Sequence, residues 1–215
     1  TKHLDCPWGY ECSEVDVEFV CVAQFGLYEI PNVPTNEPLV VRSRNADSQP
    51  NLEKKWHDTY VYGSVVWSDE IVDGRYRTNA LMVSDGQWTT IPNTLQVKGG
   101  IKGNNGAVGG RIRDCHTADR KSFTIGWATV GLESPGSAIG YFNDNEEDTV
   151  PLTDRFGTDI FGRFAIVDVA PGWNALTAAV DIGGTVTSLG REDFYLIPEA
   201  LVVVSTPGKK PILNK

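Results

Sequence analysis

The fold is decided by residues 157–172, which read Gly157-Thr158-Asp159-Ile160-Phe161-Gly162-Arg163-Phe164-Ala165-Ile166-Val167-Asp168-Val169-Ala170-Pro171-Gly172. Turn chemistry alternates here with strand chemistry. Asp159 can accept hydrogen bonds from nearby backbone N–H groups, and Gly162 can take the positive φ that closes a hairpin. Apolar residues then recur at strand spacing, with a slip at Val167-Asp168. Pro171-Gly172 suits a type II turn, because proline fixes φ and glycine accepts a positive value.

The rest of the chain repeats this pattern of short strands between turns. Segments rich in β-branched and aromatic residues recur, and no window shows an apolar stripe at helical spacing. The predicted strands are Val15–Ala23, Leu39–Arg44, Thr59–Trp67, Tyr76–Val83, Arg111–Asp114, Phe123–Val130, Ala138–Phe142, Arg163–Val169, Asn174–Val180, Phe194–Ile197 and Leu201–Val204. Their regular spacing predicts an all-β sandwich.

One known domain family shares these motifs. The pattern T-D-x-x-G-x-F-x-I, a short gap, P-G and an alternating strand resembles the carboxypeptidase regulatory-like (transthyretin-like) β-sandwich domain. The segment Val108–Asp114 fits the first strand of that domain, and the resemblance covers roughly residues 106–206. It implies a non-catalytic module of a secreted or cell-surface protein, with no catalytic residues to carry over. The acidic loop Asn143–Asp148 is longer and more charged than the pattern requires.

Three of the four cysteines lie within the first 21 residues. Cys6-Pro7-Trp8-Gly9-Tyr10-Glu11-Cys12, followed by Cys21-Val22, resembles the C-P-x-G-x-x-C…C-V knots of secreted proteins, which normally have one more cysteine upstream. Cys115 can replace that partner. Three pairings are open, and we favour Cys6–Cys21 with Cys12–Cys115. A zinc site is the alternative, but a paired C-x₂-C is missing and His116 beside Cys115 is poorly placed to chelate.

Two linkers and a C-terminal tail give four predicted parts of the chain. Residues 1–38 form a Cys-containing segment with a Pro-rich arm, and residues 39–105 form a small β domain with a Gly-rich linker. Residues 106–206 form the carboxypeptidase regulatory-like sandwich, and residues 207–215 form an extended tail. The stretch Leu39–Val97 is either a small second sandwich or shares strands with the first. The predicted fold class is therefore one or two Ig-like or transthyretin-like antiparallel β-sandwiches with a disulfide-stapled N-terminal arm.

The net charge and the hydropathy of the chain limit the classes of partner that we expect. The formal net charge of −9 over 215 residues repels phosphate backbones, so nucleic acid is excluded as a partner. No apolar run approaches the roughly 18–20 residues that a membrane span needs. The start at Thr1 without a signal peptide predicts a processed or trimmed form. Together with the cysteines, a processed form favours a location outside the cell or at the cell surface.

The acidic loop is a candidate calcium site. Asp144, Asn145, Glu146 and Asp148 concentrate the hard oxygen ligands that calcium prefers on flexible loops. The loop lacks the spacing of an EF-hand. The alternative is a solvated acidic loop that binds nothing, and no other cofactor is predicted.

The histidines and tryptophans are the remaining candidates. We predict that His3, His57 and His116 are exposed and have no role, because no catalytic motif accompanies them. We predict that Trp67 and Trp127 belong to the core. The tryptophans Trp8, Trp88 and Trp173 are the candidate exposed rings, which can stack on sugars or anchor an interface.

Three functions remain open. The leading hypothesis is a non-catalytic extracellular structural protein, a surface or filament subunit held by strand or arm exchange between copies. The first alternative is a carbohydrate-binding or adhesion module that uses exposed tryptophans. The second alternative is a polysaccharide hydrolase, although we find no catalytic motif for it in the sequence.

Overall fold

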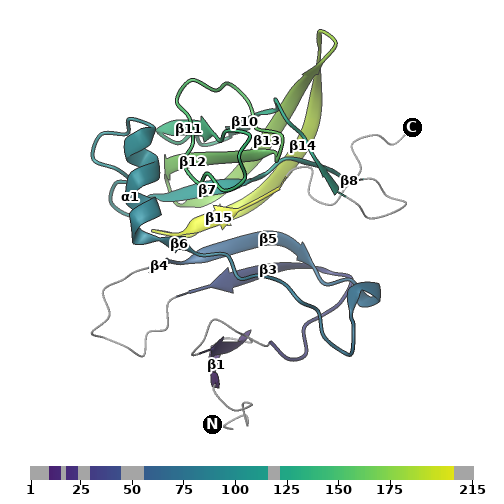
Figure 1. Cartoon of the computed structure of the whole chain (residues 1–215). Helices are drawn as coiled ribbons and strands as arrows, with labels where there is room; N and C mark the ends of the chain where they lie inside the picture. Colours follow the sequence, from purple (N-terminus) through teal and green to yellow (C-terminus); the bar gives the residue numbers. More distant parts are fainter. Residues whose placement is uncertain (1–9, 16–17, 24–29, 45–55, 116–121, 206–215) are drawn as a thin grey trace. The chain divides into compact units, whose positions relative to one another are not determined.

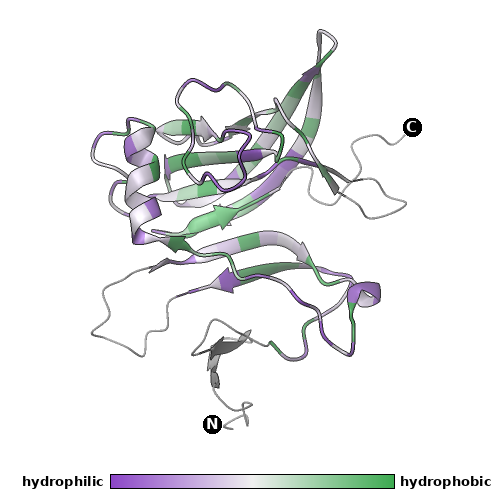
Figure 2. Ribbon diagram, in the orientation of Figure 1, coloured by the Kyte–Doolittle hydropathy of each residue, from purple (hydrophilic) through white to green (hydrophobic). Residues whose placement is uncertain are grey.

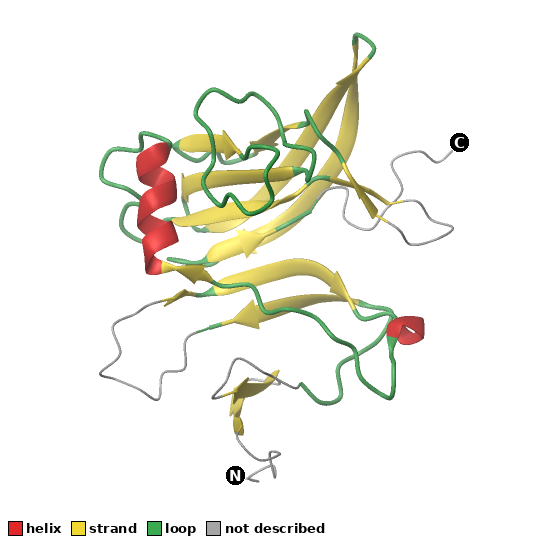
Figure 3. Cartoon of the chain, in the orientation of Figure 1, coloured by secondary structure: helices red, strands yellow, loops and turns green. Residues whose placement is uncertain are grey.

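A computed structural model of the chain describes residues 10–15, 18–23, 30–44, 56–115 and 122–205. These residues fold mainly as β-strands, as the sequence predicts (Figure 3). They divide into two compact units. The smaller unit holds the described residues before Pro38 and the segment 65–77, and the larger unit holds the other described residues. No helix in the described part is long and apolar enough to cross a membrane.

The smaller unit contains a hairpin of β1 (Tyr10–Val15) and β2 (Glu18–Ala23), and a 3-10 turn η1 (Ser68–Glu70). The backbone register of the hairpin places Cys12 directly opposite Cys21. A tight turn pairs Val72 with Arg75, and both of its central residues have positive φ, as hairpin turns favour.

The larger unit is built on a six-stranded sheet in the order β11-β12-β7-β15-β5-β3 (Figure 1). Its strands are β3 (Pro38–Ser43), β5 (Thr59–Val65), β7 (Gly106–Arg111), β11 (Ala138–Tyr141), β12 (Arg163–Val169) and β15 (Leu201–Val203). β15 pairs in parallel with both β5 and β7, which departs from the purely antiparallel prediction. β3 and β5 belong to this sheet, so the chain before residue 98 contributes strands to the same sandwich.

A second sheet, β10-β13-β14, packs against the first. It consists of β10 (Thr129–Leu132), β13 (Gly172–Ile182) and β14 (Thr185–Leu196). The core lies between the two sheets, where Phe164 and Ile166 of the first meet Leu176 and Phe194 of the second. All four are at most 2% exposed. Figure 2 shows hydrophobic residues along β12 and β15. The all-β sandwich prediction is confirmed.

A helix that the sequence pattern does not predict covers the outer face of the six-stranded sheet. α1 (Asp85–Thr94) follows the two-residue strands β4 (Trp56–His57) and β6 (Val83–Ser84). Its half-buried residues Trp88 and Ile91 pack on a cluster that includes Val167. The helix begins with a capping box, in which Ser84 Oγ accepts from the Gln87 N–H and the Gln87 side chain accepts from the Ser84 N–H.

The positive φ predicted at Gly162 and Gly172 and the predicted Asp159 contact appear in the structure. Gly162 has a φ of +71°, and Gly172 has a φ of +127°. The Asp159 carboxylate accepts the backbone N–H of Arg163 at 2.7 Å. The predicted slip is a β-bulge between Val167 and Val169, where Asp168 has a φ of +59°.

Two predicted strands are wrong, and two others, Val15–Ala23 and Arg111–Asp114, each run from the end of one strand into the next. Most of Tyr76–Val83 is irregular, and only its last residue enters β6. The segment Phe123–Val130 is split between β9 (Ser122–Thr124), which pairs with β8 (Arg113–Cys115), and β10. A turn at Gly126-Trp127 separates the two strands, because Trp127 has left-handed backbone.

Candidate functional site

The acidic loop between β11 and β12 is folded around an arginine. Arg163 Nη1 donates to the carbonyl oxygens of Glu146 and Asp148, at 3.0 and 2.9 Å. Its Nη2 donates to the carbonyl oxygens of Asn143 and Asn145, at 2.8 and 2.7 Å. Four backbone carbonyls thus surround one guanidinium. The side chain of Arg163 is 10% exposed, so this cation is part of the protein interior.

The side chains predicted to bind calcium have other contacts in this structure. Asp144 accepts from Arg155 at 2.9 Å and from the Ile160 N–H, and these bonds lower the pKa of its carboxyl. Glu146 pairs with Arg111, and Asp148 accepts from the Asn143 side chain. The side-chain oxygen of Asn145 caps the Glu147 N–H.

Among the described residues, no group of three or more His, Cys, Asp or Glu is arranged to hold a metal ion. The calcium site stays a prediction, and Arg163 is a protein cation that already organises the same loop.

Trp127 is the most unusual residue of this end of the sandwich. Its φ of +63° lies in the left-handed region, which costs about 1–3 kcal/mol for a side chain of this kind. The backbone is held there because Trp127 N–H donates to the Thr158 carbonyl at 2.8 Å and Thr158 N–H donates to the Ala128 carbonyl at 2.8 Å. Trp127 is nevertheless 69% exposed, so the prediction that it belongs to the core is wrong. The strained backbone at this position therefore carries an indole ring that is exposed to solvent.

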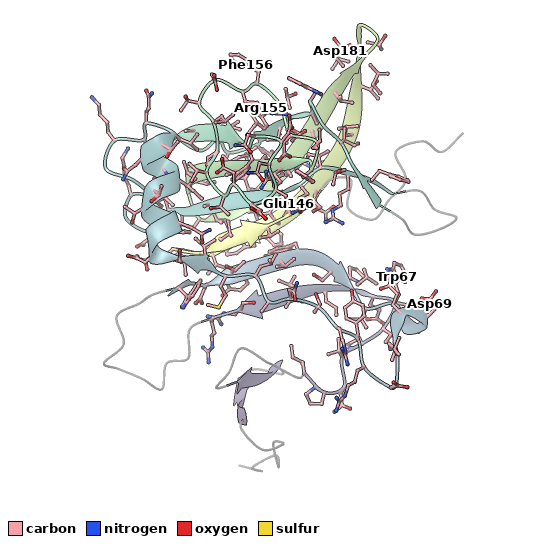
Figure 4. All side chains as sticks on the ribbon, viewed as in Figure 1. Trp67, Asp69, Glu146, Arg155, Phe156 and Asp181 are labelled. Carbon is pink, nitrogen blue, oxygen red and sulfur yellow. The ribbon has the colours of Figure 1, made fainter. Side chains whose placement is uncertain are left out.

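The segment 155–160, which contacts Trp127, also carries an ion-paired arginine and exposed apolar side chains. The Arg155 guanidinium lies over the indole, 5.0 Å from the ring centroid, and is tied to Asp144 on its other side. Phe156 follows Arg155 and is 85% exposed, and the loop presents it outward (Figure 4). The Ile160 side chain is 55% exposed, and the backbone N–H of Ile160 donates to Asp144. We call Trp127, Arg155, Phe156, Ile160 and Asp144 the Trp127 surface.

A second exposed aromatic group lies on the outer face of the three-stranded sheet. Trp173 and Tyr195 are register partners on β13 and β14. Their rings meet edge to face with centroids 5.5 Å apart. Trp173 is 77% exposed, which confirms the prediction for this residue, and Tyr195 is 40% exposed. An edge-to-face pair of this geometry fixes both rings relative to each other.

Charged side chains continue this face along the strands. Asp193 lies two residues before Tyr195 on β14, so the two side chains point to the same side of the sheet. The register partner of Asp193 on β13 is Ala175. Arg191 donates to Asp193 and across β13 to Glu133, each at 2.9 Å, and these two carboxylates raise its pKa. All three side chains are more than half exposed. We call Trp173, Tyr195, Arg191, Asp193 and Glu133 the Trp173 face.

Tyr62 of β5 supports the Trp173 face from the edge of β14. Its hydroxyl donates to the Tyr195 carbonyl at 2.9 Å and accepts the Tyr195 N–H at 3.3 Å. One side chain therefore satisfies both backbone groups that an unpaired strand edge leaves free. This contact fixes the backbone that carries Tyr195.

The prediction that Trp88 is an exposed ring is wrong. Trp88 is half-buried on α1 and stacks on His57, with centroids 4.1 Å apart and an interplanar angle of 11°. His57 is 7% exposed, so the prediction that it is exposed is wrong for this histidine. Its Nε2 lies 3.4 Å from Asp85 Oδ1, whereas the neighbouring Asp58 pairs with Arg42. The stack joins β4 to α1.

Several predicted residues lie outside the described part of the chain. These are Trp8, Cys6, His3 and His116. Cys12, Cys21 and Cys115 are described only as backbone, on β1, β2 and β8. The register of Cys12 with Cys21 brings together two cysteines that the favoured pairing separates. The disulfide pairing therefore stays a prediction, with Cys12–Cys21 among its alternatives.

Comparison of the sequence with protein-family models gives no match, and comparison with curated proteins gives none either.

Proposed function

We propose that the chain is a non-catalytic extracellular binding module, and that the Trp173 face binds carbohydrate. The observation that carries the proposal is the pair of exposed, contacting rings on the outer face of the sheet, next to the hydrogen-bonded charges of Arg191, Asp193 and Glu133. Pyranose rings have apolar C–H faces that pack on aromatic side chains, and their hydroxyls pair with carboxylates and guanidinium groups. The resemblance to the carboxypeptidase regulatory-like domain agrees with a module of this kind.

The charges of the Trp173 face select the class of glycan. One guanidinium, that of Arg191, stands against the two carboxylates of Asp193 and Glu133, which leaves one net negative charge. The whole chain carries a net charge of −9. Uronic acids and sulfated sugars are therefore repelled, and neutral or amino sugars are the expected ligands.

The experiment is an array of neutral, amino and acidic glycans, followed by calorimetry with the best ligand. We expect binding to neutral or amino sugars, and at least a tenfold loss of affinity in Trp173→Ala. Tyr195→Ala should weaken binding similarly, whereas Tyr195→Phe should retain most of it because the edge-to-face contact survives. The matched control is Trp127→Gly, which removes another exposed tryptophan and should leave sugar affinity unchanged. Absence of binding to any glycan would reject the proposal, and so would equal binding by Trp173→Ala.

The hypothesis of a filament or surface subunit held by arm exchange concerns residues 1–38 and 207–215. Most of these lie outside the described residues, so this hypothesis stays a prediction. The hydrolase alternative also stays a prediction, and the contacts of the exposed aromatic residues favour binding over it.

A further inference from the structure

We infer that the ligand of the Trp173 face is an amino sugar with a free, protonated amine, a choice that rests on the proposed function and narrows its ligand class. The two carboxylates of this face each keep one oxygen available. Arg191 binds Asp193 through Oδ1 and Glu133 through Oε2. Among the described residues, neither Asp193 Oδ2 nor Glu133 Oε1 has a hydrogen-bond or ion-pair partner. The two side chains are 65% and 63% exposed, so both oxygens are open to a ligand.

These carboxylates lie beside the aromatic pair. Asp193 precedes Tyr195 by two residues and pairs in register with Ala175. Glu133 lies on the other side of Ala175, because its N–H donates to the Ala175 carbonyl at 3.1 Å. Trp173 precedes Ala175 by two residues on β13, so Asp193 is its diagonal neighbour, at a usual Cβ separation of about 7–8 Å. A sugar ring that packs on the aromatic pair can therefore place a substituent at a carboxylate.

The charge of the surrounding sheet favours a cationic substituent. Strands β10, β13 and β14, together with the residue that follows β10, carry four carboxylates and one basic side chain. The carboxylates are Asp181, Glu133, Glu192 and Asp193, and the basic side chain is Arg191. A protonated amine adds a second cation to this excess of negative charge. Its hydrogen bonds to carboxylates are roughly twice as strong as those of a neutral group, so the free amine is preferred to a hydroxyl or an acetamido group.

The indole of Trp173 also favours a cation. An ammonium group is attracted to the face of a tryptophan ring. In the Trp127 surface this position is taken by the Arg155 guanidinium, 5.0 Å from the ring centroid. Trp173 is 77% exposed, and no arginine or lysine of the described residues lies over its ring. Of these two exposed tryptophans, Trp173 is therefore the one that can accept a cation from a ligand.

The test is calorimetry with three β-1,4-linked tetramers that differ at C2 of the sugar: those of glucosamine, N-acetylglucosamine and glucose. At low salt, and at a pH where the sugar amine is protonated, we expect the glucosamine tetramer to bind about tenfold more tightly than the other two. Added salt should reduce this preference, because the carboxylates are exposed and their attraction is screened. A pH above the pKa of the sugar amine should reduce it as well, because the ligand then loses its charge.

Asp193→Asn and Glu133→Gln should each weaken binding of the glucosamine tetramer about tenfold. Their effect on the glucose tetramer should be smaller, because an amide oxygen still accepts from a hydroxyl. The matched control is Asp181→Asn, which removes one carboxylate from the same sheet six residues beyond Ala175 on β13, about 20 Å away. It should retain the preference for glucosamine. Thermal melts should show that all three variants fold, since the substituted side chains are exposed.

Equal affinity for the three tetramers overturns the inference and leaves sugar binding by the Trp173 face intact. A preference for glucosamine that persists in both Asp193→Asn and Glu133→Gln also overturns it. Tetralysine is the probe for a site that accepts any cation, and binding as tight as that of the glucosamine tetramer, unchanged in Trp173→Ala, would overturn the choice of a sugar. Absence of binding to every glycan of the array rejects the proposed function itself, and the preference for an amine with it.

Discussion

Asp159 and Arg163 are joined twice within the protein interior. One carboxylate oxygen of Asp159 accepts the backbone N–H of Arg163 at 2.7 Å, and the other accepts its Nε at 2.6 Å. Asp159 is fully buried. The remaining guanidinium nitrogens hold the carbonyls of the acidic loop, so this pair fixes the loop that carries Asp144 and, through it, Arg155.

Removal of this cation should be strongly destabilising. In Arg163→Met the Asp159 carboxylate stays buried without its partner, and four carbonyls lose their donors. We expect a loss of about 3–5 kcal/mol in the free energy of unfolding, measured by urea denaturation. Arg111→Met, at an exposed ion pair with Glu146, should change stability by less than about 1 kcal/mol. Equal effects of the two substitutions would contradict the role given to Arg163.

Chelation should leave the loop unchanged. Because Arg163 occupies four of the carbonyls of residues 143–148, we expect EDTA or added calcium to shift the melting temperature by less than the error of the measurement. A lower melting temperature in EDTA, restored by calcium, would instead support the calcium site at Asp144, Asn145, Glu146 and Asp148.

Acid should weaken the sandwich through Asp168. Burial raises the pKa of this carboxyl, but bonds from Ser137, the Lys102 N–H and Asn105 outweigh burial and lower the pKa to about 2. The folded pKa lies below the unfolded value, so the unfolded state binds more protons in this range. Stability is thus fully present above about pH 4 and is lost as the pH falls toward 2.

Asp168→Asn tests this assignment. It should flatten the dependence of the unfolding free energy on pH between 4 and 2 by about 2 kcal/mol, which is the free energy that corresponds to a pKa lowered from 3.8 to about 2. Urea denaturation at several pH values measures it. The same slope in Asp168→Asn as in the parent would show that other carboxylates dominate acid unfolding.

Substitution by alanine should destabilise the protein at one strand glycine and be tolerated at another. A Cβ at Gly110 would lie 1.8 Å from the Val204 carbonyl oxygen, which is backbone and cannot move without displacing the chain that follows β15. Gly110→Ala should therefore cost more than about 3 kcal/mol or prevent folding. A Cβ at Gly131 meets only the Thr177 hydroxyl, at 3.7 Å, so Gly131→Ala should be tolerated. Thermal unfolding of the two variants is the measurement.

Tyr62→Phe should expose the edge of β14. The Tyr195 N–H and carbonyl lose their partner, at an expected cost of about 1 kcal/mol because water can replace it. Hydrogen exchange at the Tyr195 amide should accelerate, while amides within the β13–β14 ladder keep their protection. Unchanged exchange at Tyr195 would show that the Tyr62 hydroxyl does not hold this edge.

Local chemistry was enough to predict β12 and its turns. The positive φ of Gly162, the Asp159 contact and the bulge at Asp168 each follow from neighbouring residues, and β12 has the predicted bounds Arg163–Val169. The helix α1 was missed because Gly86 and Pro92 interrupt its apolar stripe. The Ser84–Gln87 capping box was the signal that could have revealed it.

Long-range contacts account for the other differences. Gly106, Gly109 and Gly110 resemble a linker in the sequence, but they belong to a central strand that lies against β15, almost 100 residues later. The exposure of Trp127 depends in the same way on Thr158, which holds the left-handed turn. The tryptophan of the Trp173 face was predictable because a Pro-Gly turn precedes it. Its partners Arg191, Asp193 and Glu133 come from two other parts of the sequence and carry no local motif.

The position of β15 imposes an order on folding during synthesis. β5 and β7 leave the ribosome long before residues 201–203, yet they share no ladder with each other and are joined only through β15. Until that strand arrives, both present open edges that can pair with other chains. A nascent chain of this protein therefore depends on protection from aggregation until its last described strand is made. Truncation before Leu201 should yield insoluble material and no smaller folded domain.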